Sequence, residues 1–515
     1  MKALGSTEPE TGRDGAKAHY LKARRLGIRT HQEAVVYMRT DCHVCRSEGL
    51  TPQSRVLLRN GRHEIIATLH QVASDLIGAD EAGLSEIAWE RLAVAEGDLL
   101  YASHPQSVES LGSVRSRIYG HRLGQQALLQ IVADIVAGQY SDVQLSAFIT
   151  ACAAMPLDEQ ETVALTKAMV DVGERLSWAG TPILDKHSVG GLPGNRTTPI
   201  VVSIVAAHGL TMPKTSSRAI TSPAGTADTM ETLAPVDLDL PAIRRVVEQE
   251  YGCIVWGGAV RLSPADDILI RIERALDVDS EGQLVASVLS KKIAAGSSHL
   301  VLDMPVGPTA KVRNAEAAQV LSKRLIDVAA LFGLKTRIVL SDGLQPVGRG
   351  IGPALEAHDV LAVLQNNSSA SKMLRQRACT LAGALLELGG AAREGEGVGV
   401  ALQTIVDGRA WAKFQRICEA QGGMRVPTTA KYQHPLLAGS NGTVRSIDNR
   451  KIARLAKLAG APEAKSAGVE LYVQLDRPVS AGEPVCSVHA ETPGELRYAL
   501  DYASANPEII EVAKP

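Results

Sequence analysis

The chain has 515 residues, which is too long for one hydrophobic core and predicts three or four domains. Hydrophobic residues make up 45% of the sequence and charged residues 21%, as in an ordinary soluble protein. The 54 Lys and Arg residues nearly balance the 56 Asp and Glu residues, and the resulting net charge of -2 argues against a general nucleic-acid or membrane-surface binder.

The sequence carries no sign of a membrane or secreted protein. No apolar run reaches the length of a membrane span, and residues 1–20 contain no hydrophobic signal core, so we expect a cytoplasmic protein. The seven cysteines are odd in number and scattered, which is typical of reduced thiols. Cys42 and Cys45 form a Cys-x-x-Cys pair, but neither a second pair at zinc-ribbon spacing nor a thioredoxin-like context accompanies it. We expect a structural loop there and no bound metal.

The N-terminal part of the chain predicts a tail followed by a small β-rich domain. Residues 1–20 are polar and are expected to form a mobile tail. Residues 21–103 contain short apolar-rich runs, such as 33–38 and 62–69, that read as strands. This domain shows no set of catalytic side chains, so its expected role is assembly or the shaping of a cleft.

Residues 104–180 show helical periodicity and predict a helical domain. One helix carries its apolar stripe from Leu128 to Val136 and should end at Gly138. The Ser141/Gln144 and Asp158/Glu161 spacings predict capping boxes at the start of two further helices. We expect residues 264–296 to pack on this domain.

Residues 181–428 alternate between predicted helices and apolar strands, which implies a mostly parallel sheet covered on both faces. The predicted helices span residues 242–250, 283–294 and 314–331, and the predicted strands span 253–256, 300–304 and 335–340.

Residues 429–515 no longer alternate between helices and apolar strands, and they form a separate predicted domain. A brief helix is expected at 452–458, and strands are expected at 468–473 and 484–489, joined by turns rich in Gly and Pro. Nothing in this segment indicates catalysis.

Two loops rich in glycine and hydroxyl side chains lie between residues 184 and 231, where they flank a short apolar helix. The first loop, residues 186–198, holds two cations and three glycines just ahead of Pro199, a residue that suits the first turn of a helix. The helix should end at Gly209, and its N-terminus would offer N–H donors to a phosphate. The second loop, residues 214–226, repeats the arrangement, so we interpret the pair as an anion-binding cradle at the carboxyl ends of parallel strands.

Both loops have a simpler interpretation. They are also what ordinary strand-to-helix turns look like, in which Ser and Thr cap helices and Gly permits positive φ. The occurrence of two such loops in tandem, each with cations among hydroxyls, favours the binding function.

The same stretch resembles the signature region of the thymidine phosphorylase family. That region has a Lys-His-Ser-x-Gly-Gly loop, a Ser-x-Arg segment and a Gly-Thr-x-Asp turn, which match residues 186–191, 216–218 and 225–228. The match is closest to the longer branch that includes AMP phosphorylase, because residues 216–222 read SSRAITS. Further matching pieces are residues 287–292, 341–356 and 420–423, in the order of the family. The resemblance covers about residue 105 to the C-terminus.

The resemblance implies a fold, an activity and a state of assembly. The fold would be multidomain α/β of the nucleoside phosphorylase and phosphoribosyltransferase type, with a helical domain, a mostly parallel α/β domain and a C-terminal α+β domain. The enzyme would use inorganic phosphate to cleave the N-glycosidic bond of a nucleoside 5′-monophosphate or a (deoxy)nucleoside. It would need no cofactor, and it would form a homodimer or a higher homo-oligomer.

Family motifs also nominate the site residues. Lys186 and His187 would be catalytic, and Asp279 would donate a proton to the leaving base. Ser287 and Lys291 would lie at the base end, and Lys311 would meet the 5′-phosphate of a nucleotide. The phosphate shell would be Lys186, Ser188, Thr198, Ser216 and Thr226, and the nucleotide would contact Gly191, Ser217, Arg218, Ala219, Ile220, Thr221, Ser222, Thr226, Ser287, Lys291 and Lys311.

Alternative functions remain open at this point. Thymidine phosphorylase proper is one, although Arg271 and Arg274 do not align with the arginine that reads the pyrimidine in those enzymes. A magnesium-dependent phosphoribosyltransferase of the anthranilate type is a second, although Lys186-His187-Ser188 stands where that family has a Gly-Thr-Gly-Gly-Asp loop. A non-catalytic nucleotide-binding regulator is the third.

Overall fold

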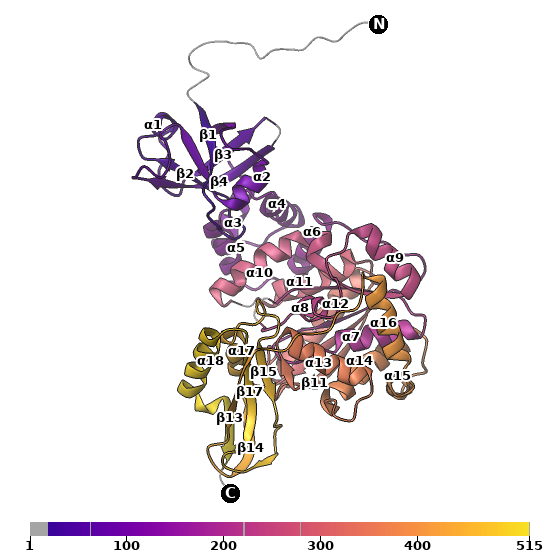
Figure 1. Ribbon diagram of the computed structural model, residues 1–515. Helices are drawn as coiled ribbons and strands as arrows, with labels where there is room; N and C mark the ends of the chain where they lie inside the picture. The colour runs from indigo at the N-terminus through magenta and orange to yellow at the C-terminus, as the bar shows by residue number, and fades with distance from the viewer. Residues whose placement is uncertain (1–18, 62, 220–221, 279, 514–515) are drawn as a thin grey trace, which may run out of the picture. The chain divides into compact units, whose positions relative to one another are not determined.

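The computed structural model describes residues 19–61, 63–219, 222–278 and 280–513, and it divides into two compact units, Met1–Met155 and Pro156–Pro515 (Figure 1). Most of the predicted tail, residues 1–18, lies outside the described residues. Its last residue, Tyr20, already begins strand β1. Among the described residues, no helix is both long enough and apolar enough to cross a lipid bilayer.

The first unit contains a six-stranded closed barrel with strand order β1-β5-β2-β4-β3-β6. The β1–β5 and β2–β4 pairs are parallel and the other pairs are antiparallel. Alternate residues such as Leu21 and Ala23, or Val56 and Leu58, point into the barrel and are buried, as the two-residue period of a strand requires. The strands are β1 (Tyr20–Arg25), β2 (Val35–Arg39), β3 (Arg55–Asn60), β4 (His63–Val72), β5 (Glu81–Leu84) and β6 (Leu99–Ser103), with short helices α1 (His43–Glu48) and α2 (Glu86–Leu92).

The Cys42–Cys45 stretch, predicted as a loop, instead begins helix α1. Cys42 is the residue before the helix, and Gly49 ends the helix in the left-handed conformation that glycine adopts without strain. Both cysteines are buried in the barrel's hydrophobic cluster. Within the described part of the chain, no group of three or more His, Cys, Asp or Glu residues is arranged to hold a metal ion.

Three helices complete the first unit: α3 (Ser110–Ile118), α4 (Gln125–Val136) and α5 (Asp142–Ala154). The predicted helix end at Gly138 is confirmed by its φ of 73°, and the predicted capping box between Ser141 and Gln144 is present. The boundary between the two units lies inside the region predicted as one helical domain.

The second unit contains the helix α6 (Glu159–Asp171), which packs mainly against α11 (Glu281–Ala294) and also contacts α10 (Pro264–Leu276). The predicted capping box between Asp158 and Glu161 starts α6. Gly282 allows α11 to approach α6 closely, because a Cβ there would lie 3.0 Å from Thr162 Oγ1 of α6 and 2.8 Å from the Cβ of Leu157, just before that helix.

A parallel sheet forms the centre of the second unit. Strand β10 (His299–Val306) pairs in parallel with β7 (Leu184–Ser188) and with β11 (Lys335–Asp342). Strand β8 (Met212–Ser216) pairs in parallel with β9 (Gly252–Trp256), and a parallel bridge between Ile183 and Thr211 links β7 to β8. The predicted strand-and-helix alternation over residues 242–340 is therefore confirmed.

Helices cover both faces of this sheet, as the sequence predicts. Val301 of β10 packs in a cluster with α7, α14 and α16, while its neighbours Leu300 and Leu302 pack in another cluster with α11 and α12. This alternation is the signature of a strand buried on both sides. The helices around the sheet are α7 (Thr198–Ala207), α8 (Thr226–Glu231), α9 (Leu240–Glu250), α12 (Ala315–Leu331), α13 (Pro353–Leu364), α14 (Lys372–Leu388), α15 (Gly397–Val406) and α16 (Arg409–Ala420).

The C-terminal part of the second unit contains two antiparallel sheets and two helices (Figure 1, yellow). Strand β12 (Gly350–Ile351) belongs to the preceding α/β segment of the sequence, but it pairs with β15 and forms the edge of the sheet β12-β15-β17-β13. The other sheet has the order β16-β14-β18. The elements of this C-terminal part are β13 (Tyr432–Leu437), β14 (Gly442–Ile447), α17 (Asn449–Leu458), β15 (Gly468–Leu471), β16 (Pro478–Val479), β17 (Pro484–Ala490), α18 (Pro493–Ala505) and β18 (Ile510–Ala513).

Candidate functional site

Lys186 lies in β7 beside the start of helix α7. The glycine-rich pattern predicts a loop for Lys186, His187 and Ser188, but all three pair with β10 as strand residues. The Lys186 side chain is buried, and its Nζ donates a 2.8 Å hydrogen bond to Oγ1 of Thr197, the residue before α7. Pro199 occupies the first turn of that helix, where its missing N–H leaves no donor unpaired. A buried cation thus meets the N-terminus of a buried helix.

Burial dominates the titration of Lys186. It lowers the pKa of the ammonium to about 8; the nearby Asp303 carboxylate opposes this shift, and the cations Arg196 and Arg377 add to it. The only hydrogen-bond acceptor of the side chain within the described residues is a neutral hydroxyl. A buried charge is costly without an anionic partner in contact, so this position would gain from a bound oxyanion.

Asp303 organises the side chains at the end of β7. Its carboxylate is fully buried and accepts hydrogen bonds from Ser188 Oγ at 2.9 Å, Asn195 Nδ2 at 2.9 Å and Ser341 Oγ at 2.6 Å. Burial alone would raise the pKa of Asp303, but the cations of Lys186 and Arg377 and these donors together hold it below its usual value. The charged carboxylate therefore fixes the orientation of Ser188.

Arg196 connects the first loop to the second. Its Nε donates to the buried Glu356 carboxylate at 2.6 Å, its Nη1 to Thr226 Oγ1 at 2.6 Å, and its Nη2 to the Ala224 carbonyl at 2.8 Å. Burial raises the pKa of Glu356, and the Arg196 guanidinium opposes that shift. Thr226 opens helix α8, so Arg196 holds that helix start against the loop that carries Ser188.

Ser216 ends strand β8, and its hydroxyl has no hydrogen-bond partner within the described residues although the oxygen is buried. The same is true of Asn195 Oδ1. Buried polar atoms are almost always paired in folded proteins, and each unpaired one costs about 1–3 kcal/mol. Two such atoms near the predicted phosphate shell indicate a place where a polar ligand supplies the missing partner.

A second charged cluster is centred on Asp185, the residue before Lys186 in β7. The Asp185 carboxylate is fully buried between Lys214 Nζ at 3.1 Å and Lys292 Nζ at 2.8 Å. Burial would raise the pKa of Asp185, but the two ammonium groups hold it below its usual value. His187 follows in the same strand; burial, and then the charges of Lys292 and Lys214, hold its pKa well below the usual value. His187 is therefore neutral at neutral pH.

The second loop is tied together by Asp228. This buried carboxylate accepts hydrogen bonds from the backbone N–H groups of Ala219 at 2.6 Å and Gly225 at 2.9 Å, and it pairs with Arg218 at 3.2 Å. The Arg218 guanidinium also pairs with Glu231 and lies 5.0 Å from the ring centre of Trp256. Ser217 and Ser222 are exposed, whereas Ile220 and Thr221 lie outside the described residues.

Helix α11 carries the predicted base-end residues. Ser287 is half-buried, and Lys291 Nζ pairs with Asp266 Oδ2 at 2.5 Å. Burial opposes the charged form of Lys291, but the Asp266 carboxylate outweighs it and raises the pKa. Gln283 lies on the same helix face, and both of its buried amide atoms have no hydrogen-bond partner within the described residues. The predicted proton donor, Asp279, lies outside the described residues.

Gly191 and Lys311 meet at the first loop. The φ of Gly191 is 83°, and a Cβ at this position would overlap the backbone N of Lys311. Only glycine therefore permits this approach. The Lys311 side chain is exposed, so the structure places its backbone, and not a buried ammonium, against the loop.

Two members of the predicted phosphate shell, Ser188 and Thr226, are held by Asp303 and Arg196, which the sequence does not nominate. Asn195 and Arg196 lie in the first predicted loop, but the sequence pattern assigns neither of them a role. Arg377 belongs to α14, far from both loops in the sequence. Asp303 is the one with a recognisable signal, because it is a single carboxylate within an otherwise apolar strand. Such a residue is rarely left buried without partners.

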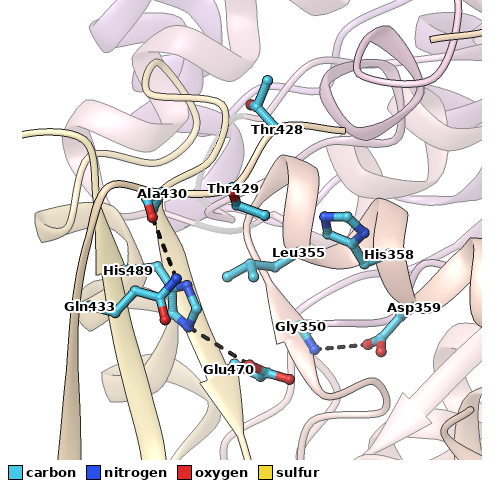
Figure 2. A pocket seen from close by; sticks show the side chains of 10 residues that line it. All are labelled: Gly350, Leu355, His358, Asp359, Thr428, Thr429, Ala430, Gln433, Glu470 and His489. Atoms are coloured by element: carbon cyan, nitrogen blue, oxygen red, sulfur yellow. Dashed lines mark hydrogen bonds and ion pairs between the residues drawn. The ribbon is translucent and has the colours of Figure 1, made fainter. Parts of the chain in front are cut away.

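A cavity of about 300 Å³ lies at a different place, between the α/β segment and the C-terminal sheet (Figure 2). Gly350, His358 and Asp359 line one side, and His489 and Glu470, 3.8 Å apart, line the other. Burial raises the pKa of Asp359 to about 6. None of the predicted site residues lines this cavity.

Comparisons with known proteins cover nearly the whole chain. Three family descriptions match: "Glycosyl transferase family, helical bundle domain" over residues 113–173, "Glycosyl transferase family, a/b domain" over 180–411, and "Pyrimidine nucleoside phosphorylase C-terminal domain" over 443–509. A relative from Chelativorans sp. (strain BNC1), named "Putative thymidine phosphorylase", is 63% identical over 97% of this chain and 98% of its own length. Relatives with the same name from Polaromonas sp. (strain JS666 / ATCC BAA-500) and Tolumonas auensis are each 59% identical, over 98% and 96% of this chain and 99% and 97% of their own lengths.

A solved structure supports the fold. Anthranilate phosphoribosyltransferase from Saccharomyces cerevisiae, in complex with PRPP and Mg, superposes with a TM-score of 0.51, covers 61% of this chain and 98% of its own, and is 16% identical. At that identity the likeness concerns the fold alone.

Proposed function

Because the chain belongs to the thymidine phosphorylase family, we infer that it is a pentosyltransferase that uses inorganic phosphate to cleave the N-glycosidic bond of a nucleoside. The products are the free base and a pentose 1-phosphate. The observation that carries the site assignment is Lys186, a buried cation at a helix start without an anion in hydrogen-bond contact. Phosphate is the anion that this reaction requires.

The phosphate shell supplies donors for this anion. Lys186, Ser188, Thr198, Ser216 and Thr226 would hold phosphate beneath C1′ of the sugar, with Asp303 and Arg196 as positioning residues. The bond from C1′ to the base nitrogen breaks with both electrons going to the base, and a phosphate oxygen forms the new bond to C1′. The sugar passes through an oxocarbenium-like state, which a fixed phosphate dianion stabilises.

The base end requires a proton or a hydrogen bond for the departing base. The resemblance assigns proton donation to Asp279, which must be protonated at working pH to serve in this role. Ser287 and Lys291 would contact the base, and neutral His187 would position the sugar or share a proton. Gln283 stands on the same face of α11 as Ser287 and would offer both a donor and an acceptor there.

The pH dependence of turnover tests the role of Lys186. Its ammonium, with a pKa of about 8, is charged below that pH and neutral above it, so kcat/KM for phosphate is expected to fall as the pH rises through about 8. Initial rates at limiting phosphate and saturating nucleoside, from pH 6 to 10, measure this decline. Lys186→Arg keeps its charge throughout and should remove the decline, at a lower overall rate. A decline that persists in Lys186→Arg would assign it to another group.

The substrate is a nucleoside or a nucleoside 5′-monophosphate, and measuring the free base released from each class of compound distinguishes between them. The named relatives favour thymidine, whereas the sequence SSRAITS at residues 216–222 resembles the AMP phosphorylase branch. We expect free base from AMP, CMP, UMP, thymidine or uridine only when phosphate is added, as measured by chromatography. Base release without phosphate, or none from any of the five, would contradict phosphorolysis.

A phosphoribosyltransferase and a non-catalytic nucleotide-binding regulator receive less support. A magnesium-dependent phosphoribosyltransferase shares the fold, but this chain has Lys186-His187-Ser188 in place of the glycine-rich loop of that family. The presence of Lys186, Ser188 and Thr226 together speaks against a non-catalytic regulator, and a phosphate-dependent turnover assay separates the two functions.

The proposal also covers the conditions in which the enzyme works. It needs no cofactor beyond phosphate as co-substrate, it acts in the cytoplasm, and it forms a homodimer or a higher homo-oligomer. All seven cysteines are free thiols, which supports a reducing compartment.

A further inference from the structure

A second, smaller cavity of about 220 Å³ lies behind the second loop. Ala219 and Ser222 of that loop line it, together with Arg274 near the end of α10 and Lys457 near the end of α17. Residues 461–463, which follow α17, complete the lining. The cavity is smaller than the roughly 300–1,000 Å³ typical of sites for drug-sized ligands, so it fits a small group.

Positive charge gathers at this cavity without matching partners. Arg274 and Lys457 line it, and neither side chain makes a hydrogen bond or an ion pair with any described residue. Arg454, one turn before Lys457 on α17, adds a third cation, and its guanidinium lies 5.7 Å from the ring centre of Tyr502. Glu463 is the single carboxylate among the lining residues.

The pKa of Lys457 reflects the same excess of positive charge at the cavity. Its pKa is lowered first by burial and then by the charges of Arg274 and Arg454, and Glu463 opposes the shift only weakly. Neighbouring like charges disfavour each other's charged form, and a bound anion would relieve that repulsion. Neighbouring Lys465, in contrast, already pairs with Glu231 at 3.0 Å.

We propose that this cavity, between Arg274 and Lys457, binds a phosphate monoester. The lining holds two cations and one carboxylate, and Arg454 on the same helix as Lys457 adds to the positive charge, whereas a phosphate monoester carries about −1.5 to −2 at pH 7. A guanidinium and an ammonium together suit phosphate oxygens, since the first donates in a fixed fork and the second from a flexible stem. The Ser222 hydroxyl already donates to the Ala224 carbonyl at 2.9 Å, so the cations are the donors.

The ligand has two possible sources with the same chemistry. It is either the 5′-phosphate of a nucleotide substrate, because the cavity wall is the loop proposed to contact the nucleotide, or a separate sugar phosphate that regulates the enzyme. The site itself does not depend on phosphorolysis, since binding is measured without turnover.

Ribose 5-phosphate is the probe, and isothermal titration calorimetry on the full chain is the measurement. Lys457→Met and Arg274→Met are each expected to weaken binding by about tenfold or more, because each removes a charge-assisted contact and keeps an apolar stem. Glu463→Gln should strengthen binding severalfold, a gain that misfolding cannot imitate. Lys451→Met is the matched control, because Lys451 is on the same helix but pairs with Glu508, and it should bind as the wild type does.

Further measurements distinguish this cavity from the phosphate site at Lys186 and identify which molecule carries the bound phosphate group. Lys186→Ala should keep ribose 5-phosphate binding even if it loses all turnover. If Lys457→Met raises the KM for UMP about tenfold and leaves that for uridine unchanged, the ligand is the 5′-phosphate of the substrate. If ribose 5-phosphate changes uridine turnover in the wild type but not in Lys457→Met, the ligand is a separate regulator. Equal ribose 5-phosphate affinity in the wild type, Lys457→Met and Arg274→Met, or no binding to the wild type, would overturn the proposal.

Discussion

Replacing Lys186 by alanine is expected to lower kcat/KM for phosphate by about 100-fold to 1,000-fold, which corresponds to about 3–4 kcal/mol of lost transition-state stabilisation. The ammonium is the one buried cation that contacts the hydroxyl at the start of α7, so no neighbouring group within the described residues replaces it there. Steady-state rates at varied phosphate concentrations measure the effect.

The fold should survive this substitution. Burial already disfavours the charged form of Lys186, so its removal relieves an electrostatic cost and the midpoint of thermal unfolding should stay close to that of the wild type. Lys413→Ala is the matched control, because Lys413 is equally buried but pairs with Glu250 at 2.8 Å, in α9. That variant should unfold at a lower temperature and keep its KM for phosphate. A folded Lys186→Ala enzyme with near-normal turnover would remove Lys186 from the phosphate site.

The largest expected effect on stability comes from Asp185→Ala. Loss of this carboxylate leaves the ammonium groups of Lys214 and Lys292 buried without a counter-charge, and breaking a buried ion pair in this way costs about 3–5 kcal/mol. Urea unfolding followed by circular dichroism measures the loss. Asp171→Ala is the control: Asp171 also pairs with two cations, Lys167 and Arg175, but on the surface, where about 1 kcal/mol or less is expected.

Two further results would identify the unpaired charge as the cause. The pKa of Lys292 lies below its usual value, so the folded state binds fewer protons than the unfolded state, and stability should rise with pH. The deficit of Asp185→Ala should therefore shrink between pH 7 and pH 9. Adding Lys292→Met to Asp185→Ala should recover part of the lost stability. Equal losses in the Asp185 and Asp171 variants would contradict the account.

The elements best predicted from the sequence are those that depend on local chemistry. The capping boxes at Ser141 and Asp158 and the helix end at Gly138 follow from side chains within four residues of each other, and all three are present. The predicted helices at 242–250, 283–294 and 314–331 and the predicted strands at 253–256, 300–304 and 335–340 follow from apolar periodicity and are confirmed, whereas α10 in the same stretch was not predicted. The four helices between 353 and 420 were not predicted. Helices α13 and α15 are apolar on most of their surface, whereas α16 carries a clear apolar stripe with Ala410, Phe414 and Ile417, a signal that could have identified it.

The candidate site is harder to predict because its partners come from distant parts of the chain. Ser188 and Asp303 are 115 residues apart, and Arg196 and Glu356 are 160 residues apart. The Lys-His-Ser and Lys-Thr-Ser segments look like loops because polar residues are rare in buried strands. They are strand residues because β10 and β9 pair with their backbones, and the ends of those strands provide the site. No local pattern reveals such pairing.

The burial of Lys186, whose ammonium contacts only a neutral hydroxyl, has a consequence for how the enzyme holds phosphate. Dissolved counterions screen surface charges over a Debye length of about 8 Å at physiological ionic strength, but they do not penetrate a packed interior. The pull of this interior charge on phosphate should therefore persist in concentrated electrolyte, whereas the exposed Arg274 loses much of its attraction there.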